Sequence, residues 1–483
     1  MLQQDNGSTP RRWPAIIQGG MGIAVSDWRL ARAVSLAGQL GVISGTAIDS
    51  VLVRRLQDGD PAGEVRRALA AFPIPGVAES ILERYFLPGG REPGQPYKLL
   101  SMPRAKVSPA REQVMMVATF VEVYLAREGH DGEIGVNLLT KVQMPNLPSL
   151  YGAMLAGVHY VLMGAGIPKE IPGVLDAFAQ HRPATLKLDV EDEQPGMSAE
   201  LRFDPMIHWG SIEPIKLDRP RFLAIIASNS LATMLSRKAS GHVDGFIIEG
   251  PTAGGHNAPP RGQLSLSETG EPLYGPRDEV DLPQMVELGR PFWIAGGAGT
   301  PEGLRAAQAA GAQGIQVGTL FAYCEESGLA AEYKHSVLDH AARGEVNVRT
   351  DPLASPTGYP FKVVQWAADP TGGRPEPRVR NCDLGYLRVA YRREDGRLGY
   401  RCSAEPIEDY LSKGGTLEAT VSRRCLCNAL MSDIGMPQVT ADGGQEPPLV
   451  TSGDDLMNIG KFLGDRTRYG AHDVIRFLLG EER

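Results

Sequence analysis

Two neighbouring stretches decide the fold, Phe292-Trp-Ile-Ala-Gly-Gly-Ala-Gly-Thr-Pro-Glu-Gly303 and Gly314-Ile-Gln-Val-Gly-Thr319. In both, a short apolar run ends in glycine-rich chain, and the first continues into a helix start with Pro301 in its first turn. Short, continuous apolar runs are typical of strands buried on both faces of a parallel sheet. The pair predicts the last two strands of a barrel, where backbone N–H groups and a helix N-terminus bind phosphate.

The same pattern recurs earlier in the chain, and helical patterns follow most of the apolar runs. Six further runs lie at residues 14–18, 39–45, 133–139, 158–163, 222–227 and 243–248. Strands that alternate with helices form βαβ units with parallel pairing. Eight such units favour a closed (β/α)8 TIM barrel of the α/β class over an open doubly wound sheet.

The spacing of the runs predicts the domain organisation. The barrel covers residues 13–325, with a helical insertion at about 46–132 and a hairpin insertion at about 183–220. Residues 326–483 form a C-terminal extension, in which the strand–helix alternation stops. We expect the extension to contain a cysteine-bearing hairpin around the turn 394–396 and a closing helical stretch over 454–479 that packs back on the barrel.

Composition and charge bound the class of protein. Of 483 residues, 42% are hydrophobic and 22% charged, as in a folded globular enzyme, and the net charge of −8 disfavours nucleic-acid binding. The 57 glycines occur without a repeat and indicate tight turns of the kind that surround phosphate-bearing ligands. Five cysteines are too few for a secreted disulfide framework, and we see no signal-peptide pattern and no apolar run of membrane-spanning length. We expect a cytoplasmic protein without a membrane partner.

A histidine follows the sixth predicted strand, in Glu249-Gly-Pro-Thr-Ala-Gly-Gly-His-Asn257. His256 would stand on the carboxyl rim of the barrel, where active sites of this fold lie, and glycines on its N-terminal side let backbone approach a ligand. Imidazole titrates near neutrality and serves as a general base or a hydrogen-bond donor. Gln18-Gly-Gly-Met-Gly22 after the first strand and Asn137 in the third point toward the same ligand.

Taken together, the motifs resemble a known family. In chain order they are Ile17-Gln-Gly-Gly-Met-Gly-Ile-Ala-Val-Ser26, Gly135-Val-Asn-Leu138, Ala253-Gly-Gly-His256, Ala295-Gly-Gly297 and Gln316-Val-Gly-Thr319. This series resembles the nitronate monooxygenase (2-nitropropane dioxygenase) family of FMN-dependent barrels, which shares its framework with FMN-dependent enoyl reductases. The resemblance covers residues 13–325 and implies an FMN cofactor.

The resemblance also implies roles for individual residues. His256 would be the catalytic residue that abstracts the α-proton of a nitroalkane or orients its nitronate. Gly297, Gly318 and Thr319 would hold the FMN phosphate. The remaining cofactor-binding candidates, beside the flavin ring or next to these residues in the chain, are Met21, Gly22, Asn137, Glu249, Gly254, Gly255, Gln316 and Val317.

The sequence departs from the family pattern at two places on this rim. Glu249 stands where the family usually has glutamine, so a carboxylate beside the flavin would need a cation such as Lys187 or an arginine of the extension. The run Asn257-Ala-Pro-Pro-Arg-Gly262 replaces the usual continuation Arg-Gly after the histidine. This longer run would stiffen the rim over the site.

Two features of the extension allow a functional and a structural interpretation. Cys382, Cys402, Cys425 and Cys427 could ligate zinc or an iron–sulfur cluster, but the last two form C-x-C rather than C-x2-C, and buried free thiols are favoured. Residues 374–401 contain eight arginines against four acidic residues. They could receive an anionic CoA or acyl-carrier thioester, although a solvated hairpin face is the more common case.

Three functions remain in competition. The leading one is an FMN-dependent oxidoreductase, nitronate monooxygenase-like, that oxidises a small nitronate or other carbon acid with O2. The second is an NAD(P)H-dependent FMN enoyl-thioester reductase of the fatty-acid or polyketide type. The third is a non-catalytic flavin-binding protein. A small-molecule substrate is expected in the first two cases, and a homodimer is compatible with all three.

Overall fold

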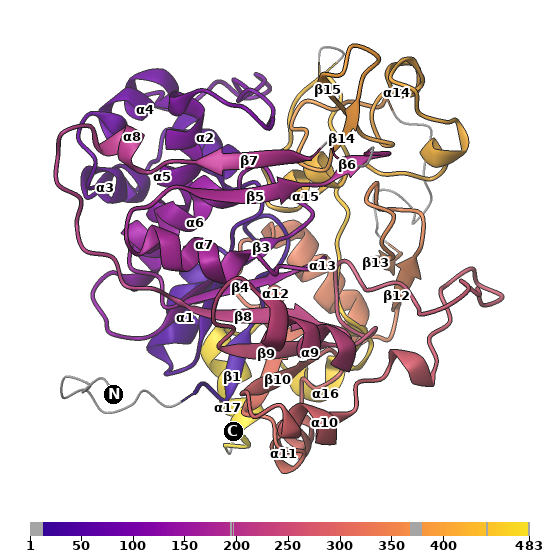
Figure 1. Cartoon of the computed structure of the whole chain (residues 1–483). Helices are drawn as coiled ribbons and strands as arrows, with labels where there is room; N and C mark the ends of the chain where they lie inside the picture. Colours follow the sequence, from indigo (N-terminus) through magenta and orange to yellow (C-terminus); the bar gives the residue numbers. More distant parts are fainter. Residues whose placement is uncertain (1–12, 194–195, 197, 368–378, 441–442, 482–483) are drawn as a thin grey trace.

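The computed structural model describes residues 13–193, 196, 198–367, 379–440 and 443–481. At its centre is an eight-stranded parallel sheet in the order β1-β11-β10-β9-β8-β4-β3-β2 (Figure 1). The strands are β1 (Ile16–Gln18), β2 (Gly41–Ser44), β3 (Ile134–Leu139), β4 (Tyr160–Gly164), β8 (Arg221–Ile226), β9 (Gly245–Glu249), β10 (Phe292–Ala295) and β11 (Gly314–Val317). All eight predicted strands are confirmed, and the fold is the predicted TIM barrel.

The barrel closes between its first two strands. Leu40 donates its N–H to the carbonyl of Ile16 at 3.2 Å and accepts from the N–H of Gln18 at 3.0 Å. The interior is filled by apolar side chains that include Ile17, Leu223 and the fully buried Trp293. Because this layer packs the lower part of the barrel, a ligand can enter only at the carboxyl rim.

The strand register aligns the ends of three neighbouring strands at that rim. Ala295 at the end of β10 lies opposite Glu249 of β9 on one side and Gln316 of β11 on the other. The chain then turns into α11 (Pro301–Ala309), whose N-cap Thr300 accepts from the N–H of Gly303, as Pro301 predicted. The other helices that alternate with barrel strands are α1 (Trp28–Leu36), α6 (Asn146–Leu155), α7 (Ile171–Phe178), α9 (Asn229–Lys238), α10 (Leu282–Glu287) and α12 (Thr319–Ala322).

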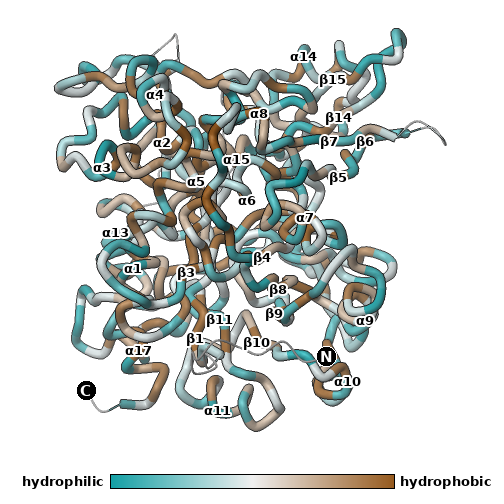
Figure 2. Tube along the Cα trace, turned by 60° about the vertical axis from the view of Figure 1, so that its left-hand side comes forward, coloured by the Kyte–Doolittle hydropathy of each residue, from teal (hydrophilic) through white to brown (hydrophobic). Residues whose placement is uncertain are grey.

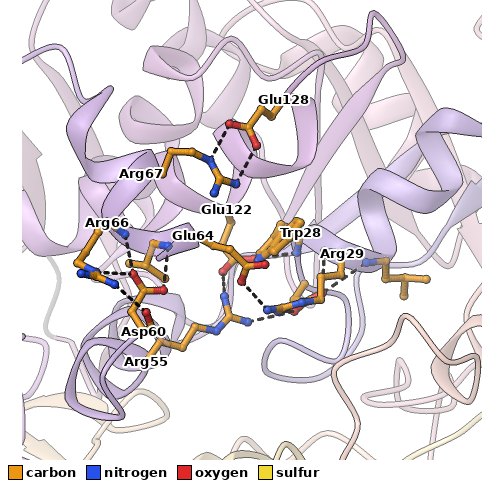
Figure 3. A network of polar contacts seen from close by, with 12 residues as sticks. Trp28, Arg29, Arg55, Asp60, Glu64, Arg66, Arg67, Glu122 and Glu128 are labelled. Atoms are coloured by element: carbon orange, nitrogen blue, oxygen red, sulfur yellow. Dashed lines mark hydrogen bonds and ion pairs between the residues drawn. The ribbon is translucent and has the colours of Figure 1, made fainter. Parts of the chain in front are cut away.

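Four helices lie between β2 and β3, where the helical insertion was expected. They are α2 (Ile48–Gln57), α3 (Glu64–Ala70), α4 (Val77–Tyr85) and α5 (Pro109–Arg127). A network of ion pairs joins three of them, α2, α3 and α5, to the start of α1 (Figure 3). Arg55 of α2 pairs with Glu122 of α5 and, at 3.1 Å, with Asp27, whose side chain caps α1. Glu122 also accepts from the N–H of Trp28 at 2.9 Å. Both carboxylates are buried, so the network is an internal connection and not a surface feature.

A hairpin between β4 and β8 forms the second insertion. β5 (Ala184–Leu188) and β7 (Ala199–Phe203) pair antiparallel, and α8 (Met206–Trp209) follows. Between them, β6 (Val190–Glu191) pairs parallel with β14 (Val389–Arg392) of the extension, and β14 pairs antiparallel with β15 (Leu398–Arg401). The expected hairpin around Gly396 is therefore confirmed, and the second insertion and the extension share one small sheet.

The extension wraps from the carboxyl rim back to the outside of the barrel. It contains α13 (Ala331–Ala342), the antiparallel pair β12 (Val346–Asp351) and β13 (Phe361–Trp366), α14 (Ile407–Ser412), α15 (Leu426–Asp433), α16 (Gly460–Leu463) and α17 (Ala471–Leu479). Three short 3-10 turns lie at Pro276–Asp278, Glu418–Thr420 and Asp454–Asn458. α17 packs against α1 and α11, close to β1 in Figure 1. The division into a barrel at 13–325 and an extension remains our proposal.

Hydropathy follows this arrangement. In Figure 2 hydrophobic segments run through the centre of the molecule, and hydrophilic segments lie mainly in outer loops. The main core joins barrel strands, insertion helices and α17 in one cluster of buried side chains. In the described part of the chain no helix is long and apolar enough to cross a membrane.

Candidate functional site

A cavity of about 400 Å³ opens at the carboxyl rim of the barrel. Its floor comes from the ends of the barrel strands, and its cover comes from the extension. It brings together most of the predicted site residues, namely Met21, Gly22, Asn137, Glu249, Gly254, Gly255, His256, Gln316, Val317, Gly318 and Thr319. The role of each residue remains a proposal.

Gly297 is placed differently from the prediction. It is exposed and does not line the cavity, whereas its neighbour Gly296 does. Gly296 has φ +89°, a conformation natural to glycine, and a Cβ there would come within 2.9 Å of the backbone nitrogen of Ala253. The turn after β10 thus presents its first glycine to the cavity and directs the second outward. Phosphate binding by this turn, and the part of Gly297 in it, stays a prediction.

One end of the cavity is built from Thr319 and a segment of the extension. The N–H of Gly453 donates to Thr319 Oγ1 at 3.1 Å, and the N–H of Gly255 donates to Thr451 Oγ1 at 2.9 Å. A Cβ on Gly254 would stand 2.8 Å from the backbone nitrogen of Gly453, so the two chain segments touch through backbone. Small hydroxyl side chains and glycine backbone form the walls here, which suits a phosphate group.

Three amide side chains that line the cavity have a buried oxygen without a hydrogen-bond partner, and besides Asn257 they are Asn137 and Gln316. Asn137 Nδ2 donates to the carbonyl of Gly20 at 3.2 Å, but Asn137 Oδ1 has no hydrogen-bond partner. Gln316 Oε1 likewise has none. Buried carbonyl oxygens nearly always find a donor, so each of these two indicates a ligand with N–H or O–H groups at this depth.

Glu249 lies on the same wall, without a cation. Burial raises its pKa to about 7, so near neutral pH the protonated and ionised forms coexist. Lys187, expected as a partner, instead pairs with Glu193 at 3.4 Å and is exposed. None of the described arginines or lysines lines the cavity, including those of residues 379–401. Protonation, rather than a salt bridge, moderates the Glu249 charge.

His256 is held by residues of the extension. Its ring contacts Phe361 edge-on with 4.8 Å between centroids, and its Nε2 lies 2.7 Å from Ser355 Oγ. Its backbone pairs with β13, because the N–H of Asn257 donates to the carbonyl of Pro360 at 2.9 Å. Burial lowers the pKa of His256 to about 4, so the ring is neutral at physiological pH.

Sequence reasoning missed the residues that the extension supplies. Ser355, Phe361, Asp433 and residues 451–453 border the cavity or hold its histidine. Asp433 is buried, which raises its pKa to about 8, and its Oδ1 accepts from the N–H of Leu449 at 2.9 Å. The only local signal was the small polar run Thr451-Ser-Gly453, which resembles the glycine-rich turns of the barrel but follows no apolar strand.

The four late cysteines gather around a second, much smaller cavity beneath the cover of the first. All are free thiols, and burial raises the pKa of Cys427 to about 12. Within the described residues no group of three or more His, Cys, Asp or Glu side chains is arranged to hold a metal ion. The structure gives the zinc and iron–sulfur interpretations no support.

Comparison with known proteins shows which proteins part of this chain is similar to. Residues 213–351 match the family model described as nitronate monooxygenase. A probable nitronate monooxygenase of Staphylococcus saprophyticus is 36% identical over 25% of this chain and 33% of its own length. A nitronate monooxygenase of Paraburkholderia phytofirmans is 26% identical over 50% of this chain and 63% of its own.

Over residues 213–351 the chain is similar to the nitronate monooxygenase family. The matched segment contains β8 to β11 and the whole stretch from Glu249 to Thr319 that builds one side of the cavity. The chain spans between about one third and two thirds of the length of these two relatives, at 33% and 63%. The crystal structure of nitroalkane oxidase from Streptomyces ansochromogenes aligns with a TM-score of 0.47 and 14% identity, over 97% of this chain and 95% of that one.

Proposed function

We propose that the chain is an FMN-dependent oxidoreductase that oxidises a small nitronate or related carbon acid with O2. One observation carries the proposal. A neutral histidine and two buried amide oxygens without partners line a single cavity, which ends in a pocket of glycine backbone and hydroxyl groups. The family match supports the same reaction class.

The residues present fit FMN. The free oxygens of Asn137 and Gln316 would accept hydrogen bonds from polar edges of the flavin ring, which carries N–H as well as carbonyl groups. Gly318, Thr319 and Gly453 would surround its phosphate, with backbone N–H groups in place of a cation. When bound, the flavin accepts electrons from the substrate and passes them to oxygen.

The protein itself positions and shields the substrate. His256 is uncharged and offers one hydrogen-bonding nitrogen to an oxygen of the substrate. Phe361 and Tyr359 cover the histidine from the extension and exclude water from the reacting atoms. Glu249 adds a proton-bearing group whose charge depends on pH near neutrality.

The test of this function starts with the purified protein. We expect bound FMN, seen as a flavin absorbance spectrum and identified after release, and aerobic turnover of nitronates such as propionate 3-nitronate. His256→Asn should lower kcat/KM by on the order of a hundredfold and leave FMN binding intact. Unchanged turnover in this variant would remove His256 from the reaction, and absence of flavin would refute the proposal as a whole.

A second candidate is reduction of an enoyl thioester with NAD(P)H. One observation favours it: the cavity continues past His256 along an apolar wall of the extension formed by Leu387, Leu426 and Leu430. A small nitroalkane would leave this wall uncovered, whereas an acyl chain would cover it. A CoA or acyl-carrier group would have to remain outside, since no described arginine reaches the cavity.

Anaerobic mixing with NADH or NADPH separates the two candidates. Bleaching of the flavin, followed by reoxidation on addition of an enoyl thioester, would establish the reductase. A flavin that stays oxidised with both nucleotides but is reduced by a nitronate would establish the oxidase. Tight FMN binding with neither response would indicate a non-catalytic flavin protein. A homodimer is a separate proposal, which the molar mass from light scattering tests.

A further inference from the structure

A chain of hydroxyl groups leads from His256 into the extension. His256 Nε2 lies 2.7 Å from Ser355 Oγ, and Ser355 Oγ lies 2.8 Å from Thr357 Oγ1. Ser355 is completely buried, so water does not reach its hydroxyl, whereas Thr357 is partly exposed. Each hydroxyl has only one proton to donate, and the direction of donation along the chain therefore fixes which nitrogen of the histidine carries a proton.

The backbone sets that direction. The N–H of Tyr359 donates to Thr357 Oγ1 at 3.3 Å, and the N–H of Thr357 donates to Ser355 Oγ at 3.2 Å. Within the described residues the Thr357 hydroxyl has one acceptor in reach, which is Ser355 Oγ. With the Thr357 proton directed there, the Ser355 oxygen already accepts two hydrogen bonds. Its own proton is then left for His256 Nε2.

We propose that Ser355 is a positioning residue that keeps His256 in the tautomer protonated at Nδ1. Nε2 then accepts the hydrogen bond from Ser355. Nδ1 has no partner among the described residues, so its N–H is available as a donor to the ligand. In this state the neutral ring cannot remove an α-proton through Nδ1. His256 instead donates a hydrogen bond to an oxygen of the substrate, either a nitronate oxygen or a thioester carbonyl.

The loop that carries Ser355 is fixed by its own contacts. Arg423 donates to the carbonyl oxygens of Leu353 and Ser355, and the N–H of Arg424 donates to the carbonyl of Ala354 at 2.9 Å. On the other side of the ring, Phe361 restricts rotation by its edge contact. The extension therefore holds both the hydroxyl and the imidazole, so that their hydrogen bond does not depend on a bound substrate.

The tautomer can be read directly by NMR on protein labelled with ¹⁵N-histidine. Two-bond ¹H–¹⁵N correlations distinguish a protonated ring nitrogen from a bare one, and His256→Gln identifies the signals. We expect the wild-type protein at neutral pH to show a protonated Nδ1 and a bare Nε2 for His256. A protonated Nε2 would overturn the proposal. This measurement needs no turnover, so its result does not depend on the proposed function. Only the identity of the substrate oxygen rests on that function.

Three variants test the chain of donors. Ser355→Ala should give a mixture of tautomers and lower kcat by at least about tenfold with little change in KM. Thr357→Val removes one donor to Ser355 and should shift the tautomer partway, while Thr357→Ser should retain the wild-type tautomer. If Ser355→Ala does not fold, the comparison of Thr357→Val with Thr357→Ser decides. Identical wild-type tautomers in every folded variant would contradict a role for Ser355.

Discussion

At the residue scale, burial leaves Glu249 only partly ionised and His256 uncharged near neutral pH. It raises the pKa of Glu249 to about 7 and lowers that of His256 to about 4. Both shifts have the same cause, because a low-dielectric cavity penalises the charged form of an acid and of a base alike. The site therefore works with hydrogen-bonding groups rather than with fixed charges.

Glu249 should control the pH dependence of flavin reduction. Below about pH 7 its carboxyl is protonated, and above it the carboxylate would oppose negative charge on the flavin that we propose binds beside it. The rate of flavin reduction by substrate should therefore fall as pH rises through that value. In Glu249→Gln the profile should be flat between about pH 6 and about pH 8. Stopped-flow absorbance measures the rate of flavin reduction in the wild type and in the variant. If the variant shows the same pH transition, that transition belongs to a group other than Glu249.

Gly254 allows the extension to reach the barrel rim. A Cβ at this position would stand 2.8 Å from backbone atoms of Ser452 and Gly453, which cannot rotate away. Gly254→Ala should cost about 1–3 kcal/mol of unfolding free energy and weaken FMN binding, because residues 451–453 must move. Urea unfolding and fluorescence titration with FMN measure the two effects.

The matched control for this change is Gly275→Ala. A Cβ on Gly275 meets no atom within 4 Å, and its φ of −135° is accessible to alanine. If the two substitutions lower the unfolding free energy and FMN binding equally, the close approach of backbone at Gly254 is not the cause of these losses.

At the element scale, a buried ion-pair network joins the insertion helices to the barrel. Arg55 on α2 compensates the carboxylates of Asp27 and Glu122, which belong to α1 and α5 (Figure 3). Burial raises the pKa of Glu122 in spite of this pairing. Arg55 thus balances both carboxylates where the three helices meet, and Arg29 adds a second ion pair to Asp27 at 3.0 Å.

Arg55→Leu should therefore destabilise the protein by about 3–5 kcal/mol at pH 7, because Glu122 is left buried without its ion-pair partner and Asp27 keeps only the half-exposed Arg29. The folded protein then binds protons more tightly than the unfolded chain, so stability decreases with rising pH and the loss is smaller at about pH 5. Denaturant unfolding at the two pH values measures this difference.

The pair Arg67–Glu128 supplies the control, since it lies at 2.9 Å on the surface. Arg67→Leu should change stability little at either pH, because exposed ion pairs contribute little. A loss in Arg67→Leu as large as that in Arg55→Leu would mean that burial is not what distinguishes the two pairs.

At the scale of the whole molecule, the extension completes the site and also covers the outside of the barrel. Its residues hold His256, border the end of the cavity at Thr319 and form its apolar wall. α17 returns to pack Val474, Ile475 and Leu478, all buried, as part of the main core. The barrel and the extension therefore share one hydrophobic core.

A chain that ends at residue 325 should not fold stably. Loss of the extension would expose the core side of α1 and α11 that α17 covers, together with the rim around His256. We expect aggregation, or protein without a cooperative thermal transition and without FMN binding. Calorimetry compares the thermal transitions of the truncated and the full-length chain. A cooperative transition near that of the full-length protein would show that residues 13–325 form an autonomous domain.

What sequence could predict followed from local patterns. The strand ending at Ala295 and the helix capped by Thr300 depend on residues close in the chain, and both are where the pattern put them. The choice between Gly296 and Gly297 depends on backbone dihedral angles that their identical side chains do not encode. Lys187 failed as a partner of Glu249 because the insertion hairpin pairs it with Glu193 instead.

The sequence by itself determined the barrel, its rim and the motifs that end its strands, because apolar runs and glycine turns are local signals. Only the tertiary structure decided which residues complete the cavity. Ser355 lies 99 residues from His256 in the chain, and Thr451 lies 196 residues from Gly255. No periodicity connects residues at such separations, and their contacts arise when the extension folds over the rim and buries the histidine. The same contacts determine that this histidine is neutral and hydrogen-bonded to Ser355.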